Sequence, residues 1–332
     1  MRYGIWNNKG GVGKSFLSFV LSTEYANANP KKQVLVADMC PQANLSEIVL
    51  GGNGAGSKVL EKLIKSRQTL GGYFDSRIAS PHSLTGGETG FLLHAYTYNK
   101  NVPQNLWIIA GDPSLELQAQ VINQISAQTL PADAWKSVHN WLLDLLLACG
   151  KKLGLQDTVS FIDCNPSFSA YTELAMMASE RIIVPCSSDG SSARAIDNVG
   201  SLLYGLGSQT YTRGFATEAK EFKMPLPVIH SVLLNRSTQY NKKASKAFGA
   251  MFDEIKARTE TIRKAAPQYF AKGAGFAEIP DNHSIAIVCS HLGRPLYSMT
   301  PGQYPVHDEN PQINADPLDR YKEHVASFLT SL

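Results

Sequence analysis

The stretch Asn7-Asn8-Lys9-Gly10-Gly11-Val12-Gly13-Lys14-Ser15 decides the fold of this 332-residue chain. It directly follows the short apolar run Tyr3–Trp6 and leads into the helix-forming segment Ser15–Ala28. Glycines carry no Cβ, so consecutive backbone N–H groups can point inward around an anion. The start of the following helix adds unpaired N–H donors and a partial positive charge. This order of strand, glycine-rich loop and helix predicts a phosphate-binding loop rather than a plain turn.

Two side chains of this loop suit a nucleotide bound together with magnesium. Lys14 is placed to reach the β- and γ-phosphates, and the Ser15 hydroxyl is a typical magnesium ligand. We therefore expect Mg²⁺ and ATP as cofactors, held by the loop backbone from Gly10 to Gly13 and by these two side chains.

The rest of the chain alternates short apolar runs with longer amphipathic segments, which predicts βα units and a parallel sheet. The expected fold class is α/β, a doubly wound and mainly parallel sheet flanked by helices. The expected strands are Tyr3–Trp6, Gln33–Ala37, Leu106–Ala110, Val159–Ile162, Arg181–Pro185 and Val228–Leu234. The expected helices are Ser15–Ala28, Ala134–Lys152, Tyr171–Ala178, Ser192–Leu206, Lys243–Ile262 and Leu318–Leu332.

The absence of an internal repeat favours one domain over residues 1–332. Within it, a loop-rich insertion is expected at about 51–105, because Gly51–Gly56 and Thr69–Thr89 are rich in glycine, serine and threonine. Met299–Pro317 is expected to be an irregular surface segment before a C-terminal helix at about 318–332.

Cysteine content and hydropathy indicate the compartment. The five cysteines are widely spaced with no C-x-x-C pair, so neither a disulfide framework nor a zinc or iron–sulfur site is indicated. No apolar run is long enough to cross a bilayer. We expect a cytoplasmic protein.

The loop residues Lys9–Ser15 at the N-terminus resemble the signature of ParA/MinD-type ATPases, the deviant Walker A class of P-loop ATPases. In this family the extra lysine, here Lys9, reaches across a nucleotide-sandwich dimer to the partner's phosphates. The resemblance implies an ATP-dependent homodimer with Lys9 and Lys14 as catalytic residues. Phe16 replaces the usual second hydroxyl after the lysine, so contacts to the α-phosphate are expected to depend more on backbone donors.

The segment Asp38-Met39-Cys40-Pro41-Gln42-Ala43-Asn44 resembles the first switch region of the same family, which commonly has the pattern D-x-D-P-Q-x-N. Asp38 is expected at the catalytic and magnesium site. Cys40 occupies the place of the second aspartate, which the family uses to orient attacking water. A thiol is mostly neutral near pH 7 and is a poor substitute. Two readings stay open: hydrolysis is slow, which we favour, or Asp38 or a partner residue takes the role.

Three further matches extend the resemblance along the chain. Phe161–Ser167 is similar to the family's Walker B strand end, so Asp163 joins Ser15 and Asp38 as a metal-site residue. Val232–Arg236 resembles the strand whose terminal asparagine, here Asn235, reads the adenine ring. Ala277–Asn282 is similar to the segment that packs against the base. The nucleotide-binding residues expected from these two segments are Asn235, Arg236, Pro280, Asp281 and Asn282.

Charge is unevenly distributed: residues 206–275 hold 12 Lys or Arg against 5 Asp or Glu, in a chain of net charge +3. Charge alone favours a solvated face over a nucleic-acid surface. Relatives of the ParA type bind DNA without sequence preference, which makes Lys242, Lys243 and Lys246 candidate phosphate contacts. A ParB-like stimulating partner is then expected. The alternatives are a regulatory or scaffold ATPase without DNA binding, and a MinD-like membrane-associated ATPase. The C-terminal helix is expected to pack on the domain, because it has few cations.

Overall fold

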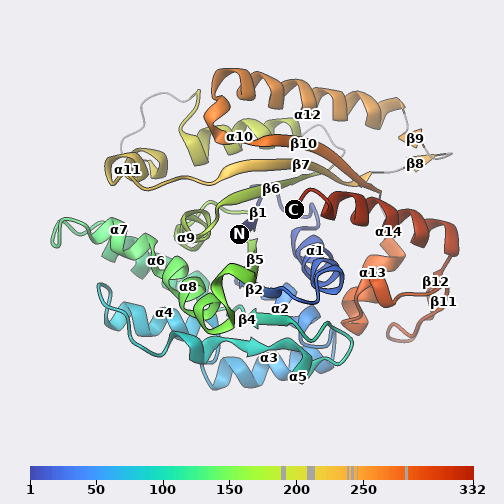
Figure 1. The fold of residues 1–332 in the computed structure, drawn as a ribbon, viewed down its shortest axis with the longest axis horizontal. Coiled ribbons are helices and arrows are strands. Elements are labelled where there is room, and N and C mark those ends of the chain that lie inside the picture. The colour runs from blue at the N-terminus through green and yellow to red at the C-terminus, as the bar shows by residue number, and fades with distance from the viewer. Residues whose placement is uncertain (188–191, 208–213, 238, 241–242, 245, 281–282) are drawn as a thin grey trace.

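A computed structural model describes residues 1–187, 192–207, 214–237, 239–240, 243–244, 246–280 and 283–332. Its centre is an eight-stranded sheet of order β10-β7-β6-β1-β5-β2-β4-β3 (Figure 1). Every neighbouring pair runs parallel except β3 and β4, which are antiparallel. The strands are β1 (Arg2–Ile5), β2 (Gln33–Met39), β3 (Leu93–His94), β4 (Leu106–Ile109), β5 (Thr158–Cys164), β6 (Arg181–Cys186), β7 (Val228–Ser237) and β10 (Phe270–Pro280).

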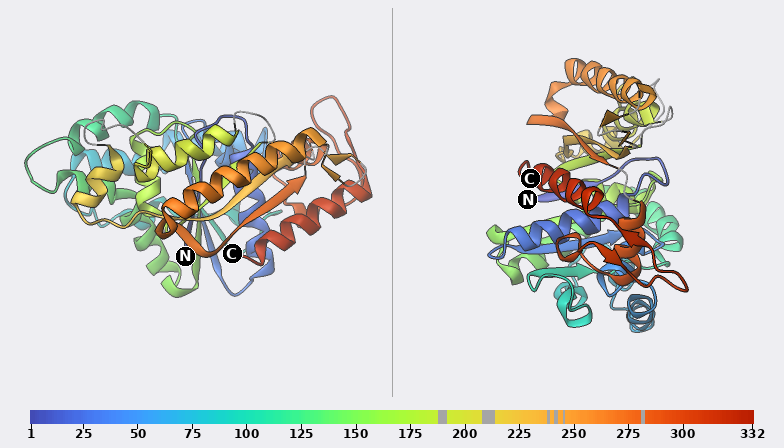
Figure 2. Two further views of the ribbon diagram at one scale, coloured as in Figure 1. Left: turned by 90° about the horizontal axis from the view of Figure 1, so that it is seen from above. Right: turned by 90° about the vertical axis from the view of Figure 1, so that its right-hand side faces the viewer.

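Helices cover both faces of this sheet, so its strands are apolar on both sides. One face carries α1 (Lys14–Ala28), α2 (Asn44–Val49), α3 (Ala55–Lys65), α5 (Ala95–Tyr98), α13 (His283–Leu292) and α14 (Ala315–Leu329). The other carries α4 (Leu70–Ala79), α6 (Leu115–Ser126), α7 (Ala134–His139), α8 (Trp141–Leu153), α9 (Ala170–Ala178), α10 (Ser192–Tyr204), α11 (Phe215–Glu221) and α12 (Lys246–Ala265). Figure 2 shows α12 running along the edge of the sheet formed by β10 and β7.

Strand β2 shows how the sequence produces this two-sided core. Alternate side chains point to opposite faces of a strand. Leu35 and Ala37 belong to the apolar core on one face, whereas Val34 and Val36 belong to the core on the other. The predicted doubly wound, mainly parallel α/β fold is confirmed, and each of the six predicted strands overlaps an observed one.

The prediction of a loop over Thr69–Thr89 was wrong for its first half. Helix α4 occupies Leu70–Ala79, and the Thr69 hydroxyl accepts a hydrogen bond from the Gly72 N–H at its start. Gly72 is required here because a Cβ would lie 1.8 Å from the Arg67 carbonyl oxygen. Close packing therefore explains glycines that otherwise indicate a turn. Helix α3 likewise begins at Ala55, within Gly51–Gly56, so the 51–105 region contains three α-helices between its loops.

Two other boundaries differ from the predictions. The helix predicted over Ala134–Lys152 is divided at Asn140 into α7 and α8. The helix predicted to begin at Lys243 begins at Lys246, because Lys243–Ala244 form the short strand β9, antiparallel to β8 (Gln239–Tyr240). Within Met299–Pro317 lie the short paired strands β11 (Gly302–Gln303) and β12 (Gln312–Ile313).

The C-terminal helix packs on the domain, as predicted. Four apolar residues of α14 are buried in the core it shares with α1: Leu318, Tyr321, Val325 and Phe328. Within the described ranges, no helix combines the length and the apolar character that a membrane crossing requires.

Candidate nucleotide-binding site

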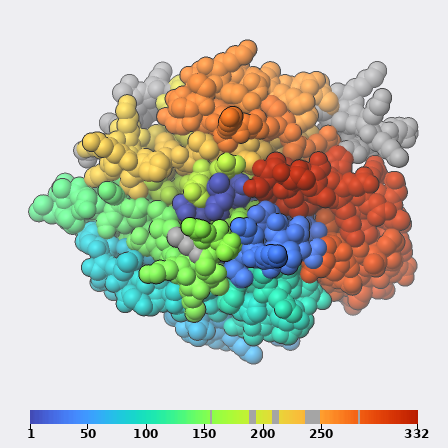
Figure 3. All heavy atoms as spheres, viewed as in Figure 1, coloured from blue at the N-terminus to red at the C-terminus, as the bar shows by residue number. Residues whose placement is uncertain are grey.

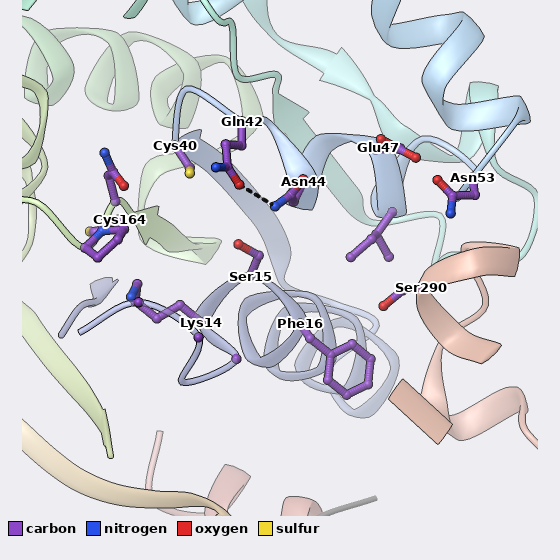
Figure 4. Close-up of a pocket in the computed structure, with 16 residues that line it drawn as sticks. Lys14, Ser15, Phe16, Cys40, Gln42, Asn44, Glu47, Asn53, Cys164 and Ser290 are labelled. Carbon is purple, nitrogen blue, oxygen red and sulfur yellow. Dashed lines mark hydrogen bonds between the residues drawn. The ribbon is translucent and has the colours of Figure 1, made fainter. Parts of the chain in front are cut away.

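A cavity of about 600 Å³ lies over the carboxyl ends of β2 and β5, beside the start of α1 (Figure 4). Ligands of open α/β sheets bind at this edge. Three parts of the chain form its wall: the loop before α1, the segment from Cys40 through α2, and the end of β5. Its lining residues are Gly10, Gly11, Gly13, Lys14, Ser15, Phe16, Cys40, Gln42, Asn44, Glu47, Ile48, Asn53, Cys164, Asn165, Pro166 and Ser290.

The phosphate loop is held in an anion-ready shape by its own polar groups. Gly11 and Gly13 have φ of 77° and 80°, in the left-handed region that favours glycine. The Lys14 ammonium donates to the carbonyl oxygens of Asn7 at 3.1 Å and of Lys9 at 2.7 Å. Burial lowers the pKa of Lys14, although Asp163 opposes this. The Lys14 ammonium therefore lies inside the loop, hydrogen-bonded to neutral carbonyl groups.

The Asp163 carboxyl group lies beneath the loop and is fully buried. Its Oδ1 accepts from the Ser18 hydroxyl at 3.0 Å, whereas its Oδ2 has no hydrogen-bond partner among the described residues. Burial and the neighbouring Asp38 carboxyl group raise the pKa of Asp163 to about 7, and a Ser15 hydrogen bond opposes the rise. A buried carboxylate oxygen without a partner, next to the Ser15 hydroxyl, fits the oxygen donors that Mg²⁺ prefers.

Asp38 stands beside Asp163 because the two residues are paired in the register of β2 and β5. Its oxygens are already occupied. Oδ1 accepts from the Cys40 N–H at 3.1 Å, and Oδ2 accepts from the N–H and the hydroxyl of Ser46 at 2.8 and 2.7 Å. Burial raises the pKa of Asp38 to about 6. Asp163 is thus better placed than Asp38 to face a cation, while Asp38 holds the start of α2.

Cys40 lines the cavity and is 8% exposed. Burial, with Asp38 and Asp163 nearby, raises the pKa of its thiol to about 12. The thiol is therefore neutral at physiological pH and does not accept a proton from water as a carboxylate would. Cys40, which departs from the D-x-D-P-Q-x-N pattern, is therefore not a proton acceptor in this cavity.

Lys9 and Asn235 both connect the loop to neighbouring strands. The Lys9 ammonium donates to the Ser187 hydroxyl at 3.0 Å, just after β6. The Asn235 amide, 4% exposed near the end of β7, donates to the Val12 carbonyl oxygen at 2.7 Å. Asn235 therefore supports the phosphate loop in this structure, a contact that sequence reasoning did not predict.

The remaining predicted site residues are placed only in part. Pro280 is buried at the end of β10, where it pairs with Ser237, and the backbone of Arg236 belongs to β7. Asp281, Asn282 and Lys242 lie outside the described residues. For the other two DNA-contact candidates, only the backbone is described, Lys243 in β9 and Lys246 at the start of α12.

Several cavity residues were not singled out as site residues from the sequence. Glu47, Asn53 and Ser290 are polar residues on or near α2 and α13, and Figure 4 shows their side chains gathered on one side of the cavity. No local motif marks them, since they come together only when α13 packs against α2. Ser46 gave no signal either, although its hydroxyl completes the Asp38 site.

Comparison with known proteins identifies the family of the chain and relatives of its fold. Residues 3–258 match the family model described as the CobQ/CobB/MinD/ParA nucleotide-binding domain. No curated protein matches the sequence. The fold is similar to that of apo McdA from Cyanothece, with a TM-score of 0.57 and 15% identity, covering 99% of this chain and 98% of that one.

Two further solved structures share the fold. An ATP complex of a Cyanothece McdA variant gives a TM-score of 0.59 at 14% identity and covers 99% of this chain and 96% of that one. A plasmid partition protein from Borrelia burgdorferi gives 0.51 at 16% identity, covering 100% and 98%. The family model spans most of the sequence, and the cavity is lined by the glycine-rich loop and Lys14, close to the buried carboxyl groups of Asp38 and Asp163. The chain belongs to the CobQ/CobB/MinD/ParA family of nucleotide-binding domains.

Proposed function

We propose that this protein is a switch ATPase of the ParA type, which binds Mg-ATP, dimerises, and partitions or positions DNA or another cargo. The observation that carries the proposal is the arrangement at the loop: a buried ammonium held by carbonyl oxygens, above a buried carboxylate whose Oδ2 has no partner in the described part of the chain. Both groups have unmet charge, of opposite sign, and a magnesium-bound triphosphate supplies both counter-charges.

In this proposal, nucleotide binding gives Lys14 and Asp163 new partners. Lys14 gives up the carbonyls of Asn7 and Lys9 for phosphate oxygens, which are stronger acceptors because they are charged. Asp163 Oδ2 and the Ser15 hydroxyl hold Mg²⁺ or its bound water, and the metal would neutralise phosphate charge. Lys9 turns from Ser187 toward the phosphates of the partner subunit. Two facing triphosphates repel each other, so a lysine supplied by each subunit makes dimerisation depend on ATP.

We further propose that hydrolysis is slow. The neutral Cys40 thiol stands where a carboxylate would orient water, and Asp38 is engaged with Ser46. The ATP-bound dimer is then long-lived and acts as a timer. In this proposal the dimer grips DNA through phosphate contacts, a ParB-like partner stimulates turnover, and the site of action is the cytoplasm. The five free cysteines are all buried thiols, which suits a reducing compartment.

Gel filtration with and without Mg-ATP tests the switch, together with phosphate release. Wild type should shift to a dimer with ATP, and Lys9→Ala should remain monomeric while still binding nucleotide. Lys151→Ala, which removes an exposed lysine on α8, is the matched control and should behave as wild type. Equal dimerisation of wild type and Lys9→Ala would remove the sandwich model.

DNA binding is tested separately, by fluorescence anisotropy of a labelled duplex at several salt concentrations. The proposal expects binding only with ATP, and an affinity whose logarithm falls by about 0.9 per neutralised phosphate for each unit of log salt. Dimerisation with ATP but no DNA binding at low salt would leave the regulatory or scaffold ATPase. ATP-dependent binding to anionic vesicles would instead support the membrane-associated alternative.

A further inference from the structure

We propose that a second cavity, between β7, β10 and α14, binds a small phosphate-bearing anion. Its volume is about 520 Å³, and none of the described residues that line it also lines the nucleotide cavity. Arg181 is the first residue of β6, so this cavity opens at the amino ends of the strands, opposite the phosphate loop. Figure 3 shows that face, where the surface of α14 meets the segment that contains β10 beside the N-terminal residues.

An irregularity in β7 directs two neighbouring polar side chains into this cavity. Ile229 pairs with Ile182 and Ser231 pairs with Ile183, so His230 is an extra residue in the ladder. Such a bulge re-aims side chains. His230 and Ser231 both line the cavity, and the His230 ring meets Tyr3 edge-on at 5.5 Å between centroids. A regular strand would send one of these two side chains to the opposite face.

Ser231 is a buried polar residue of the cavity wall whose hydroxyl lacks a hydrogen-bond partner in the described ranges. The residue is 4% exposed, and its hydroxyl has no hydrogen-bond partner within the part of the chain that the structure describes. Buried hydroxyl groups in proteins are nearly always hydrogen-bonded. Because Ser231 lines the cavity, its hydroxyl, unpartnered among the described residues, lies next to the space in which we place the ligand.

The charges around Ser231 favour an anion. Arg181 and Lys272 line the cavity, and within the described part of the chain Arg181 forms no ion pair. Its guanidinium lies 3.2 Å from His230 Nδ1. That position needs a neutral imidazole, and burial together with Arg181 lowers the pKa of His230. A guanidinium without a carboxylate partner is suited to a phosphate group, which it binds through two parallel hydrogen bonds.

The wall also holds histidine, hydroxyl and acidic groups, among them the Ser331 hydroxyl, which lies 3.4 Å from His230 Nε2. His324 lines it from α14, and its Nδ1 lies 2.8 Å from the Glu278 carbonyl oxygen. Glu278 is the one acidic residue among the described lining residues, and the Leu332 main-chain oxygen lies close by, where it accepts from the Tyr3 hydroxyl. Among the described lining residues, the strong cations Arg181 and Lys272 outnumber the one acidic residue, Glu278.

Depth and space select a small ligand. His230 and Ser231 are 7% and 4% exposed, too deep for the backbone of a DNA duplex. Room in the cavity comes partly from Gly275, which pairs with Ser231. A Cβ at Gly275 would meet only the Gly273 carbonyl oxygen, at 3.8 Å. A larger side chain at position 275 is therefore tolerated by the strand and occupies ligand space.

The test is a titration of the full chain with inorganic phosphate, followed through the imidazole nitrogens of His230 and His324 by NMR. These signals separate the proposed site from the phosphate loop, because none of the described residues around the nucleotide cavity is a histidine. Saturable shifts of both imidazoles are expected for wild type. Ser231→Ala and Arg181→Gln should weaken binding, the latter by about tenfold or more, as loss of a charge-assisted hydrogen bond implies.

Two controls keep the result interpretable. Gly275→Val should abolish the shifts while the melting temperature stays near that of wild type, and Lys151→Gln, with the same charge change on α8, should bind as wild type. Unsaturable or absent shifts in wild type would overturn the proposal. So would equal binding by wild type and Gly275→Val, or shifts produced by a DNA duplex but not by phosphate.

Discussion

Replacing Asp163 by asparagine should stabilise the nucleotide-free protein at pH 8 and abolish its stabilisation by Mg-ATP. The substituted amide keeps the shape of the side chain and an acceptor for the Ser18 hydroxyl, which donates to Oδ1 in the wild-type protein. It removes a negative charge that is fully buried beside Asp38. The variant thus separates what the carboxylate costs the fold from what it contributes to binding.

The magnitude follows from the pKa of Asp163, which rises from an ordinary 3.8 to about 7. Each pKa unit corresponds to roughly 1.4 kcal/mol, so the ceiling is about 4 kcal/mol. Asp38 shares the repulsion, and we expect roughly 1–3 kcal/mol to be recovered. At about 2 °C per kcal/mol for a chain of this size, the melting temperature should rise by about 2–6 °C.

The sign depends on pH. A carboxyl group whose folded-state pKa is raised takes up a proton on folding, so its contribution to stability is complete below about pH 4 and is lost as pH rises through about 7. The advantage of Asp163→Asn should therefore be largest above pH 7 and shrink progressively toward pH 4. Differential scanning fluorimetry across this range measures it directly.

The exposed residue Asp308 provides the control, since Asp308→Asn should leave the melting temperature unchanged at every pH. If Asp163→Asn were destabilised equally at pH 8 and pH 5, the buried charge would not be in conflict with the fold. If Mg-ATP raised the melting temperature of this variant as much as that of wild type, Asp163 would not be part of the metal site.

Three other substitutions probe separate parts of the structure. Asn235→Ala removes the donor to the Val12 carbonyl and should cost about 1–2 kcal/mol in urea unfolding, with weaker nucleotide binding by titration calorimetry; unchanged values would show that the contact does not support the loop. Cys40→Asp should speed phosphate release while lowering nucleotide-free stability at pH 8, because it adds a third carboxylate; Cys40→Ser should do neither, and unchanged turnover in Cys40→Asp would show that Cys40 is not limiting. Phe328→Ala, at a side chain only 5% exposed, should cost about 3–5 kcal/mol by chemical denaturation, and a small loss would contradict packing of α14 on the domain.

The sequence predicted most reliably what local patterns encode. The loop from Lys9 to Ser15 can be predicted from the spacing of its residues alone. The six expected strands are buried on both faces, so their apolar runs are continuous. Edge strand β10 was not among the predicted strands. Its burial alternates irregularly, and residues such as Lys272 and Gly275 do not mark a strand when read alone.

Contacts that no sequence motif marks account for the features that could not be predicted. Thr69 and Gly72 are residue types typical of loops, yet they lie at the start of α4. There the Thr69 side chain accepts from the Gly72 N–H, and the missing Cβ of Gly72 leaves room for the Arg67 carbonyl oxygen. Ser46 lies eight residues beyond Asp38 with nothing in the spacing to connect them. This hydrogen bond forms only because the chain after β2 turns back, which places the first turn of α2 next to Asp38.

Ser46 connects the Asp38 carboxyl group to two neighbouring segments of the chain. The Ser46 hydroxyl donates to Asp38 and accepts from the Gly111 N–H at 2.8 Å. Gly111 has to be small here, because a Cβ would lie 3.0 Å from the Asp38 carboxyl carbon. One buried carboxyl group thus fixes the end of β2, the start of α2 and the segment after β4.

The charge on Asp38 is in turn linked to Asp163, since burial raises both pKa values and the Asp38 carboxyl group raises the pKa of Asp163 further. A cation at Asp163 favours the ionised form of both, and an ionised Asp38 binds the two Ser46 donors more strongly. If Asp163 binds a cation as proposed, the cation would therefore tighten α2, which carries the cavity-lining residues Asn44 and Glu47. This coupling passes through Asp38 and Ser46 rather than Cys40. In the proposed function, a chain with a thiol at position 40 would accordingly keep its response to nucleotide binding while hydrolysis is slow.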